Sequence, residues 1–233
     1  MFTIDLNAKV YHVEQDMNLL DFIRNEARIT SLKNGCSEGA CGACTLLVNG
    51  KAMRACSLTV GKVAGKKLLT VEGLTPREQD IYAGAFAEAG AVQCGYCIPG
   101  MVMSAKALLD QNPDPSPQEI KHAIRGNICR CTGYVKIEKG ILLAASALRG
   151  EPVPKAIIEG GIGTSLNRVD ARAKTLGLAK YVDDMQVDDM LHAAVLRSKY
   201  PRALVRTIDV SQAWQSPGVV AVMTADAIPG QRY

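Results

Sequence analysis

The chain opens with short segments in which apolar and polar residues alternate, a pattern that predicts β-strands. Two turn-forming residues separate the members of each pair of segments, which favours hairpins. The first hairpin turns at Asn7-Ala8, and the second turns at Asn49-Gly50, a dipeptide that favours a type I′ turn. The predicted strands are residues 2–6 and 9–13, then 45–48 and 51–55.

A helix is predicted between the two hairpins. The apolar residues at positions 19–23 follow helical spacing, and Asn18 before them is suited to the N-cap. Residues 67–71 predict one further strand. Strands wrapped around a single helix make a small α+β domain, which we expect over residues 1–75.

The pattern becomes helical after Pro76. Ser116 and Glu119 form a capping box, with Pro117 at the first helical position. We therefore expect a four-helix unit over residues 76–150. Its predicted helices are residues 77–89, 99–110, 117–124 and 138–148.

The pattern changes again beyond a Gly- and Pro-rich stretch, which predicts a linker over residues 151–160. Residues 161–233 are expected to form part of an α/β domain. Their predicted strands are residues 191–197, 203–210 and 219–223.

All eight cysteines fall into two groups of four with different spacings. The first group reads Cys36-x4-Cys41-x2-Cys44-x11-Cys56. Three closely spaced cysteines with a later fourth are typical of a plant-type [2Fe–2S] site. Zinc also accepts four thiolates, but zinc sites usually pair two short knuckles, so the spacing favours iron–sulfur.

The second group reads Cys94-x2-Cys97 and then Cys129-x-Cys131. Taken alone, two such pairs are compatible with zinc or with a second iron–sulfur cluster. A helical bundle rich in Ala, Ile and Leu would bury the site in a low dielectric, which suits a redox centre. The rival interpretation is a zinc-stabilised interaction module.

Charge and composition narrow the possible partners. The chain has 233 residues and a formal net charge of +4 that counts each cysteine as neutral. Each cluster with its four thiolates would change that charge by about −2, so two clusters bring it close to zero. The beginning of the sequence has no apolar signal segment, and no stretch is long and apolar enough for a membrane span. We expect a cytoplasmic protein that binds neither nucleic acid nor membrane.

Three long motifs, residues 34–45, 93–101 and 127–134, resemble the iron–sulfur domain of the molybdenum hydroxylases. This is the family of xanthine dehydrogenases and aldehyde oxidoreductases. The resemblance covers residues 1–150 and implies a β-grasp ferredoxin domain followed by a four-helix domain, each with one [2Fe–2S] cluster. It also implies that the second cluster lies nearest a molybdopterin cofactor, with Gln93 and Cys131 touching the pterin.

Residues 160–233 are similar to the opening of the molybdenum-binding subunit of the same family, with a hammerhead-like α/β fold. A short linker stands where many xanthine oxidases carry a flavin domain. The resemblance therefore implies either an enzyme without flavin or FAD on a separate subunit. The family's pterin-binding segments and base glutamate are not found in these residues. We therefore expect either that a molybdenum-binding catalytic partner supplies them or that the sequence is a truncated product.

The resemblance implies an electron-transfer part of an oxidoreductase. Electrons would pass from molybdenum through the second and then the first cluster to a flavin subunit or another acceptor. Purines such as xanthine are the favoured substrates, and the alternative is a component of a flavin-free aldehyde oxidoreductase. A free-standing ferredoxin is less consistent with residues 160–233.

Overall fold

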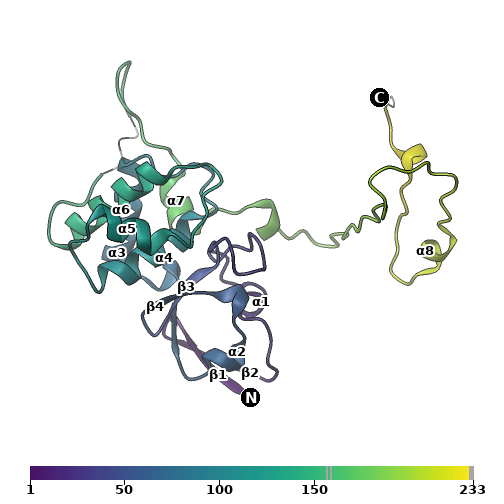
Figure 1. Cartoon of the computed structure of the whole chain (residues 1–233), viewed down its shortest axis with the longest axis horizontal. Helices are drawn as coiled ribbons and strands as arrows, with labels where there is room; N and C mark the ends of the chain where they lie inside the picture. Colours follow the sequence, from purple (N-terminus) through teal and green to yellow (C-terminus); the bar gives the residue numbers. More distant parts are fainter. Residues whose placement is uncertain (156, 158, 231–233) are drawn as a thin grey trace. The chain divides into compact units, whose positions relative to one another are not determined.

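The first part of the chain forms a five-stranded sheet with the order β2-β1-β5-β3-β4. In the computed structural model, which describes residues 1–155, 157 and 159–230 (Figure 1), both predicted hairpins are confirmed. Asn49 and Gly50 have φ of 47° and 79°, as a type I′ turn requires. The strands are β1 (Phe2–Leu6), β2 (Lys9–Val13), β3 (Thr45–Val48), β4 (Lys51–Arg54) and β5 (Lys67–Leu69).

Strand β5 closes the sheet between the two hairpins. It runs parallel to β1 and antiparallel to β3, so segments far apart in sequence become neighbours. It ends at Leu69, earlier than the sequence predicts, because residues Val71–Gly73 turn into a short 3-10 helix.

The predicted helix at residues 19–23 shares a buried core with the sheet. Asn18 caps α1 (Leu19–Asp21) by accepting a hydrogen bond from the Leu20 N–H at 2.9 Å. The helix continues as a π-helical turn over Phe22–Glu26. Apolar side chains from the helix and the sheet, including Ile4, Leu6, Leu19, Phe22, Ile23 and Leu46, form one buried cluster.

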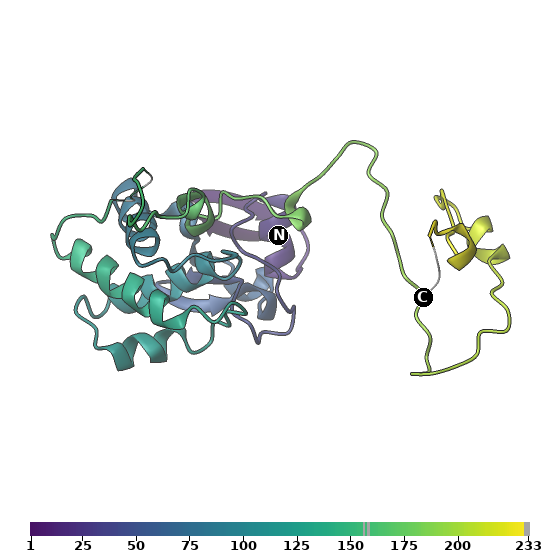
Figure 2. The same cartoon turned by 90° about the horizontal axis from the view of Figure 1, so that it is seen from above.

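The next part of the chain contains four longer helices, and Figure 2 shows them beside the sheet. Both α3 and α5 begin with capping boxes, at Thr75–Glu78 and Ser116–Glu119. Helices α3 and α6 pack closely because Gly140 leaves room for the Phe86 ring. The helices are α3 (Pro76–Glu88), α4 (Ile98–Leu109), α5 (Pro117–Ile124) and α6 (Tyr134–Leu148).

Three helices differ from the predictions or were not predicted. Helix α6 begins at Tyr134 rather than near residue 138, because the turn after Cys131 leads directly into it. The short helices α2 (Val60–Val63) and α7 (Ala171–Thr175) carry too few apolar repeats for a periodic signal. Their formation depends on tertiary packing, since Val60 and Ala171 are buried.

Contacts between residues divide the chain into two units, residues 1–185 and 186–233. The second unit contains α8 (Ser211–Gln215) and a 3-10 turn at Ala225–Ala227. The three strands predicted there are wrong for this structure, because none of its described residues forms a strand. A strand needs a neighbour for its backbone hydrogen bonds, and the alternating segments of this unit do not pair with one another.

No helix in the described part of the chain is long and apolar enough to cross a membrane.

Candidate iron–sulfur sites

The first cysteine group lies on the loop between the π-helical turn and β3, with its fourth member after β4. Gly39 and Gly42 hold this loop in left-handed conformations, with φ of 75° and 69°. Cys44 is buried, whereas the other three thiols are half-buried. The ferredoxin-like sheet therefore presents the group close to the protein surface. Its members are Cys36, Cys41, Cys44 and Cys56.

These four thiols are arranged as two pairs. Cys36 and Cys41 interact directly, as do Cys44 and Cys56, and the pairs influence each other electrostatically. Two pairs of thiolates match the ligand arrangement that two irons of one cluster require. The sequence brings the second pair together because β3 and β4 are hairpin partners.

Backbone N–H groups point at the first pair. The N–H groups of Glu38 and Cys41 both donate to the Cys36 sulfur at 3.4 Å. Mainly because of these two donors, the pKa of Cys36 is lowered to about 6. Burial instead raises the pKa of Cys44 to about 12. A loop that directs donors at sulfur is suited to hold a thiolate ligand.

Gly35 leaves space for the Cys41 sulfur. A Cβ at this position would lie 2.8 Å from the Cys41 sulfur, closer than van der Waals contact allows. The loop can therefore wrap around the sulfurs only because position 35 lacks a side chain. The donor set, the N–H groups and this cradle all fit a [2Fe–2S] cluster.

The second cysteine group lies between the helices. Cys94 and Cys97 precede α4, and Cys129 and Cys131 lie on the loop between α5 and α6. Cys94 interacts with Cys131, and Cys97 interacts with Cys129, which again gives two pairs.

The two pairs of the second group differ in burial. Cys97 and Cys129 are each only 7% exposed, whereas Cys94 is exposed. Burial, and then the neighbouring Cys129, raises the pKa of Cys97. The Cys94 N–H donates to Cys131 and lowers the pKa of that thiol. One pair thus faces the helical core, and the other faces outward.

Among the described residues, no three His, Cys, Asp or Glu side chains converge on a position for a single metal ion. In both cysteine groups, the thiols are instead arranged in pairs.

A cavity of about 800 Å³ lies beside the outward pair. Gln93 and Cys94 line it, together with the cationic side chains of Lys136 and Arg168. Gln93 is exposed, and its side-chain oxygen would lie 3.0 Å from a Cβ at position 133. Gly133 therefore allows Gln93 to pack against the loop that carries Cys131.

Asn127 joins the two cysteine-bearing parts, a role that the sequence analysis missed. Its buried amide donates to the Gly42 carbonyl at 2.9 Å and accepts from the Ser104 hydroxyl at 2.7 Å. Asn127 falls within the third long motif, and its position two residues before Cys129 was the signal available in the sequence. It connects positions 85 residues apart, which the sequence pattern does not reveal.

A second connection passes directly between the cysteine loops. The Ile128 N–H donates to the Cys41 carbonyl at 2.8 Å, and Ile128 is covalently bonded to Cys129. Tyr134 supports the same loop, because its hydroxyl accepts from the Cys129 N–H at 2.8 Å. A chain of covalent bonds and one hydrogen bond therefore links a cysteine of each group.

Family comparisons match three successive segments. Residues 4–80 match the 2Fe-2S iron-sulfur cluster binding domain, and residues 70–142 match the [2Fe-2S] binding domain. Residues 176–233 match the a/b hammerhead domain of aldehyde oxidase and xanthine dehydrogenase. The first two matches define a protein with two [2Fe–2S] clusters and contradict the zinc-module alternative.

Comparisons with individual proteins give the same result as the family comparisons. The nicotinate dehydrogenase small FeS subunit of Eubacterium barkeri is 46% identical over 147 residues, which cover 61% of this chain and 94% of that subunit. The aldehyde oxidoreductase of Megalodesulfovibrio gigas is 34% identical over 233 residues, covering 94% of this chain but 26% of that enzyme. The crystal structure of the aldehyde oxidoreductase from Desulfovibrio desulfuricans gives a TM-score of 0.86 at 36% identity, covering 98% of this chain and 27% of that one.

The chain therefore belongs to the molybdenum hydroxylase family of oxidoreductases, which includes the xanthine dehydrogenases and aldehyde oxidoreductases. The predicted α+β fold class, with a β-grasp ferredoxin part, a four-helix part and a hammerhead-like segment, is confirmed.

Proposed function

We propose that this chain carries electrons within a molybdenum hydroxylase complex. It would receive them from a molybdopterin-containing catalytic part and deliver them to a flavin subunit or another acceptor. The observation that carries this proposal is the presence of two thiol quartets in one unit, linked through Cys41, Ile128 and Cys129. When bound, each [2Fe–2S] cluster can take up and release one electron.

We assign the cluster ligands to the eight cysteines. Cys36 and Cys41 would hold one iron of the first cluster, and Cys44 and Cys56 the other. The pairing of the thiols and the N–H groups directed at Cys36 support this assignment. In the second cluster, the pairs would be Cys94 with Cys131 and Cys97 with Cys129.

Electron entry is assigned to the second quartet. Cys94 of its outward pair lines the cavity together with Gln93, so a flat cofactor could approach this sulfur without entering the helical core. We propose that Gln93 and Cys131 contact the pterin there. Lys136 and Arg168 line the same cavity with Glu88, and Arg168 is paired with Asp170, so the cavity wall offers both donors and acceptors to a polar cofactor. The first quartet, on an exposed loop, would be the exit.

We further propose domain limits at residues 1–75, 76–150 and 161–233, with residues 151–160 as the linker. Separate buried clusters support the first limit, since one is built mainly from residues before Leu68 and the other mainly from residues after Val71. None of the eight cysteines forms a disulfide, which suits a reducing compartment, and we propose a cytoplasmic location.

The substrate of the complex is proposed to be an N-heterocycle or an aldehyde. A purine such as xanthine was favoured by the resemblance, and a probable xanthine dehydrogenase subunit of Bacillus subtilis is 39% identical over 152 residues. Aldehyde oxidation is the second candidate, supported by the aldehyde oxidoreductases that match almost the whole chain. The latter similarity also favours an arrangement in which no flavin domain interrupts the chain.

Metal analysis of two single variants tests the proposal. Anaerobically purified protein should contain about four irons and four sulfides per chain. Cys129→Ser should lose about half of both, and Cys36→Ser should lose the other half, giving two different residual EPR signals after reduction. Ser198→Ala, which changes an exposed hydroxyl far along the chain, should keep all four irons.

Two results would contradict the proposed electron-transfer function. A wild-type protein with far fewer irons and no inorganic sulfide would have no clusters to carry electrons. Simultaneous loss of both clusters in each cysteine variant would contradict two independent quartets. Co-purification of molybdenum with the chain, followed by assay with xanthine and with an aldehyde, would separate the two substrate classes.

A further inference from the structure

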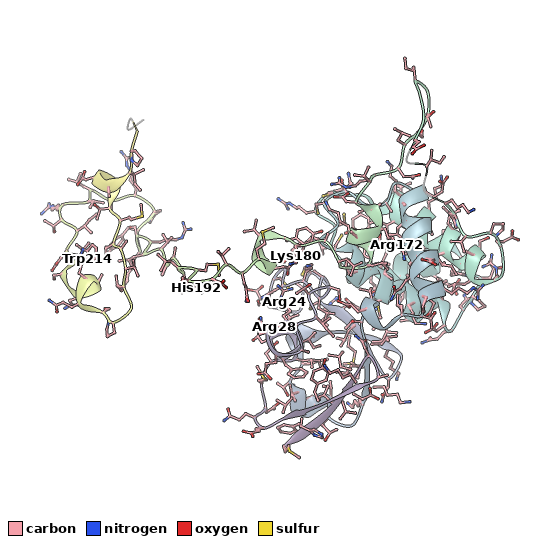
Figure 3. All side chains as sticks on the ribbon, turned by 180° about the vertical axis from the view of Figure 1, so that it is seen from behind. Arg24, Arg28, Arg172, Lys180, His192 and Trp214 are labelled. Carbon is pink, nitrogen blue, oxygen red and sulfur yellow. The ribbon has the colours of Figure 1, made fainter. Side chains whose placement is uncertain are left out.

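A segment beyond the fourth long helix lies across both cysteine-bearing parts, and we call residues 167–184 the strap. Figure 3 labels Arg172 over the helices and Lys180 further along the same segment. At the beginning of the strap, the Asn167 amide donates to the Ala87 carbonyl at 2.6 Å. Arg172 pairs with Asp80 at 2.8 Å. This half of the strap is therefore attached to α3.

The other end of the strap is attached to the ferredoxin-like part. The Asp184 side chain is only 2% exposed and accepts from Lys33 at 2.5 Å and from Arg24 at 2.8 Å. Lys33 is itself 1% exposed, and an unpaired ammonium group at such a position would be strongly unfavourable. Lys33 lies three residues before Cys36, at the base of the first cysteine loop.

Tyr181 touches both cysteine loops. Its hydroxyl donates to the Cys94 carbonyl at 2.8 Å, and the Lys33 ammonium lies 4.7 Å from the centre of its ring. Tyr96 packs edge-on against the same ring at 5.2 Å and donates from its hydroxyl to the Asn34 carbonyl at 3.0 Å. Two tyrosines thus connect the loop of Cys94 with the residues that precede Cys36.

The backbone of the strap is shaped for this position. Gly177 has a φ of 72°, and a Cβ there would lie 2.3 Å from the Ser31 Cβ. Gly95 lies between Cys94 and Tyr96. Because it has no side chain, it leaves space for the Lys174 side chain, which would lie 2.7 Å from a Cβ at position 95. The strap therefore packs closely against its neighbours at both glycines, as expected for a specific contact.

We propose that the strap fixes the spacing of the two clusters and that Tyr181 is its principal positioning residue. This inference rests on the proposed function, because it requires both clusters to be present. The ring of Tyr181 holds the two loops together, and its hydroxyl compensates the dipole of the Cys94 carbonyl. Both groups contact the cysteine loops, so we expect their effect on the positions and potentials of the clusters.

The two roles of Tyr181 can be measured separately. Without the hydroxyl, the Cys94 carbonyl leaves the second cluster in a more negative environment, which disfavours its reduced form. Tyr181→Phe should therefore lower the second cluster's potential by up to about 59 mV, a tenfold change for one electron, with an unchanged first cluster. The magnetic interaction between the two reduced clusters should remain, because the ring is still present.

Removal of the ring tests the spacing. Tyr181→Leu should weaken the magnetic interaction as well as shift the potential, because dipolar coupling falls steeply with distance. Tyr200→Phe is the matched control, since Tyr200 is 71% exposed, and it should change neither. Potentials and coupling are read from redox titrations followed by EPR, after iron and sulfide have been assayed.

The results discriminate clearly. If Tyr181→Leu keeps full cluster content with unaltered coupling, the strap does not position the clusters. If Tyr181→Phe keeps both potentials, the Tyr181 hydroxyl does not act on the second cluster. Loss of iron from Tyr181→Leu would support the role of the ring in holding the cysteine loops, and the Tyr181→Phe potential would then test the hydroxyl. A wild-type protein without iron would refute the proposed function instead, before any variant is compared.

Discussion

At the residue scale, Gly35 is a position where a single added methyl group should disturb the first cluster directly, through the Cys41 sulfur. Its missing Cβ leaves space for the Cys41 sulfur, which would otherwise lie only 2.8 Å away. Gly35→Ala should therefore displace this sulfur and reduce the iron content of the first cluster. Overpacking of this kind typically costs about 1–3 kcal/mol. The measurement is iron and sulfide content together with the EPR signal of each cluster.

Gly161→Ala is the matched control, because a Cβ there would have no neighbour within 4 Å and no special backbone conformation is needed. It should leave both clusters intact. Equal iron in Gly35→Ala and the wild type would show that the loop yields easily and does not depend on this glycine.

The cysteines and the residues around them differ in how well the sequence reveals them. Spacing alone was sufficient to group the eight cysteines, because three ligands of the first site lie within nine residues. Asn127 and Tyr181 could not be found in this way. Their partners, Gly42 and Cys94, are 85 and 87 residues away, and only the tertiary structure brings them together.

At the element scale, capping boxes determine where two of the helices begin. Ser116 accepts from the Glu119 N–H, and Glu119 accepts in return from the Ser116 N–H at 2.8 Å. The sequence predicted this start because both partners lie within one turn. Ser116→Ala should lower the free energy of unfolding by about 1 kcal/mol, with full iron content. Thermal unfolding followed by circular dichroism measures the change.

Thr59→Ala provides the comparison, since Thr59 occupies the N-cap of α2 but its side chain makes no capping bond. It should be almost neutral. An equal loss of stability in both variants would mean that the Ser116 hydroxyl contributes nothing as a cap.

Elements that depend on distant partners were predicted less well than helices with local caps. The start of helix α5 at Pro117 was predicted and its end lies where it was expected, near Ile124, whereas the described residues form no strand at 191–197, 203–210 or 219–223. Alternation indicates which face of a strand could be buried, but it does not supply the neighbouring strand. Leu196 and Leu204 are 101% and 84% exposed, so these segments bury little of their apolar surface.

At the scale of the whole molecule, the buried Arg24–Asp184–Lys33 cluster connects the two ends of the first unit and makes its stability depend on pH. Burial would raise the pKa of Asp184, but hydrogen bonds from Lys33 and then Arg24 outweigh it and lower the pKa below its ordinary value. A lowered carboxyl pKa stabilises the folded state above the unfolded pKa of about 3.9. That stabilisation is lost as the pH falls through the folded pKa.

Asp184→Asn should therefore destabilise the protein by about 3–5 kcal/mol at neutral pH, because it leaves the buried Lys33 ammonium without its counter-charge. The difference from the wild type should stay constant down to about pH 5 and shrink below about pH 4, where the wild-type carboxyl also becomes neutral. Thermal midpoints measured across this range provide the test. Asp188→Asn, at an exposed position, should follow the wild type throughout. A difference that persists unchanged at low pH would mean that Asp184 contributes through packing rather than through its charge.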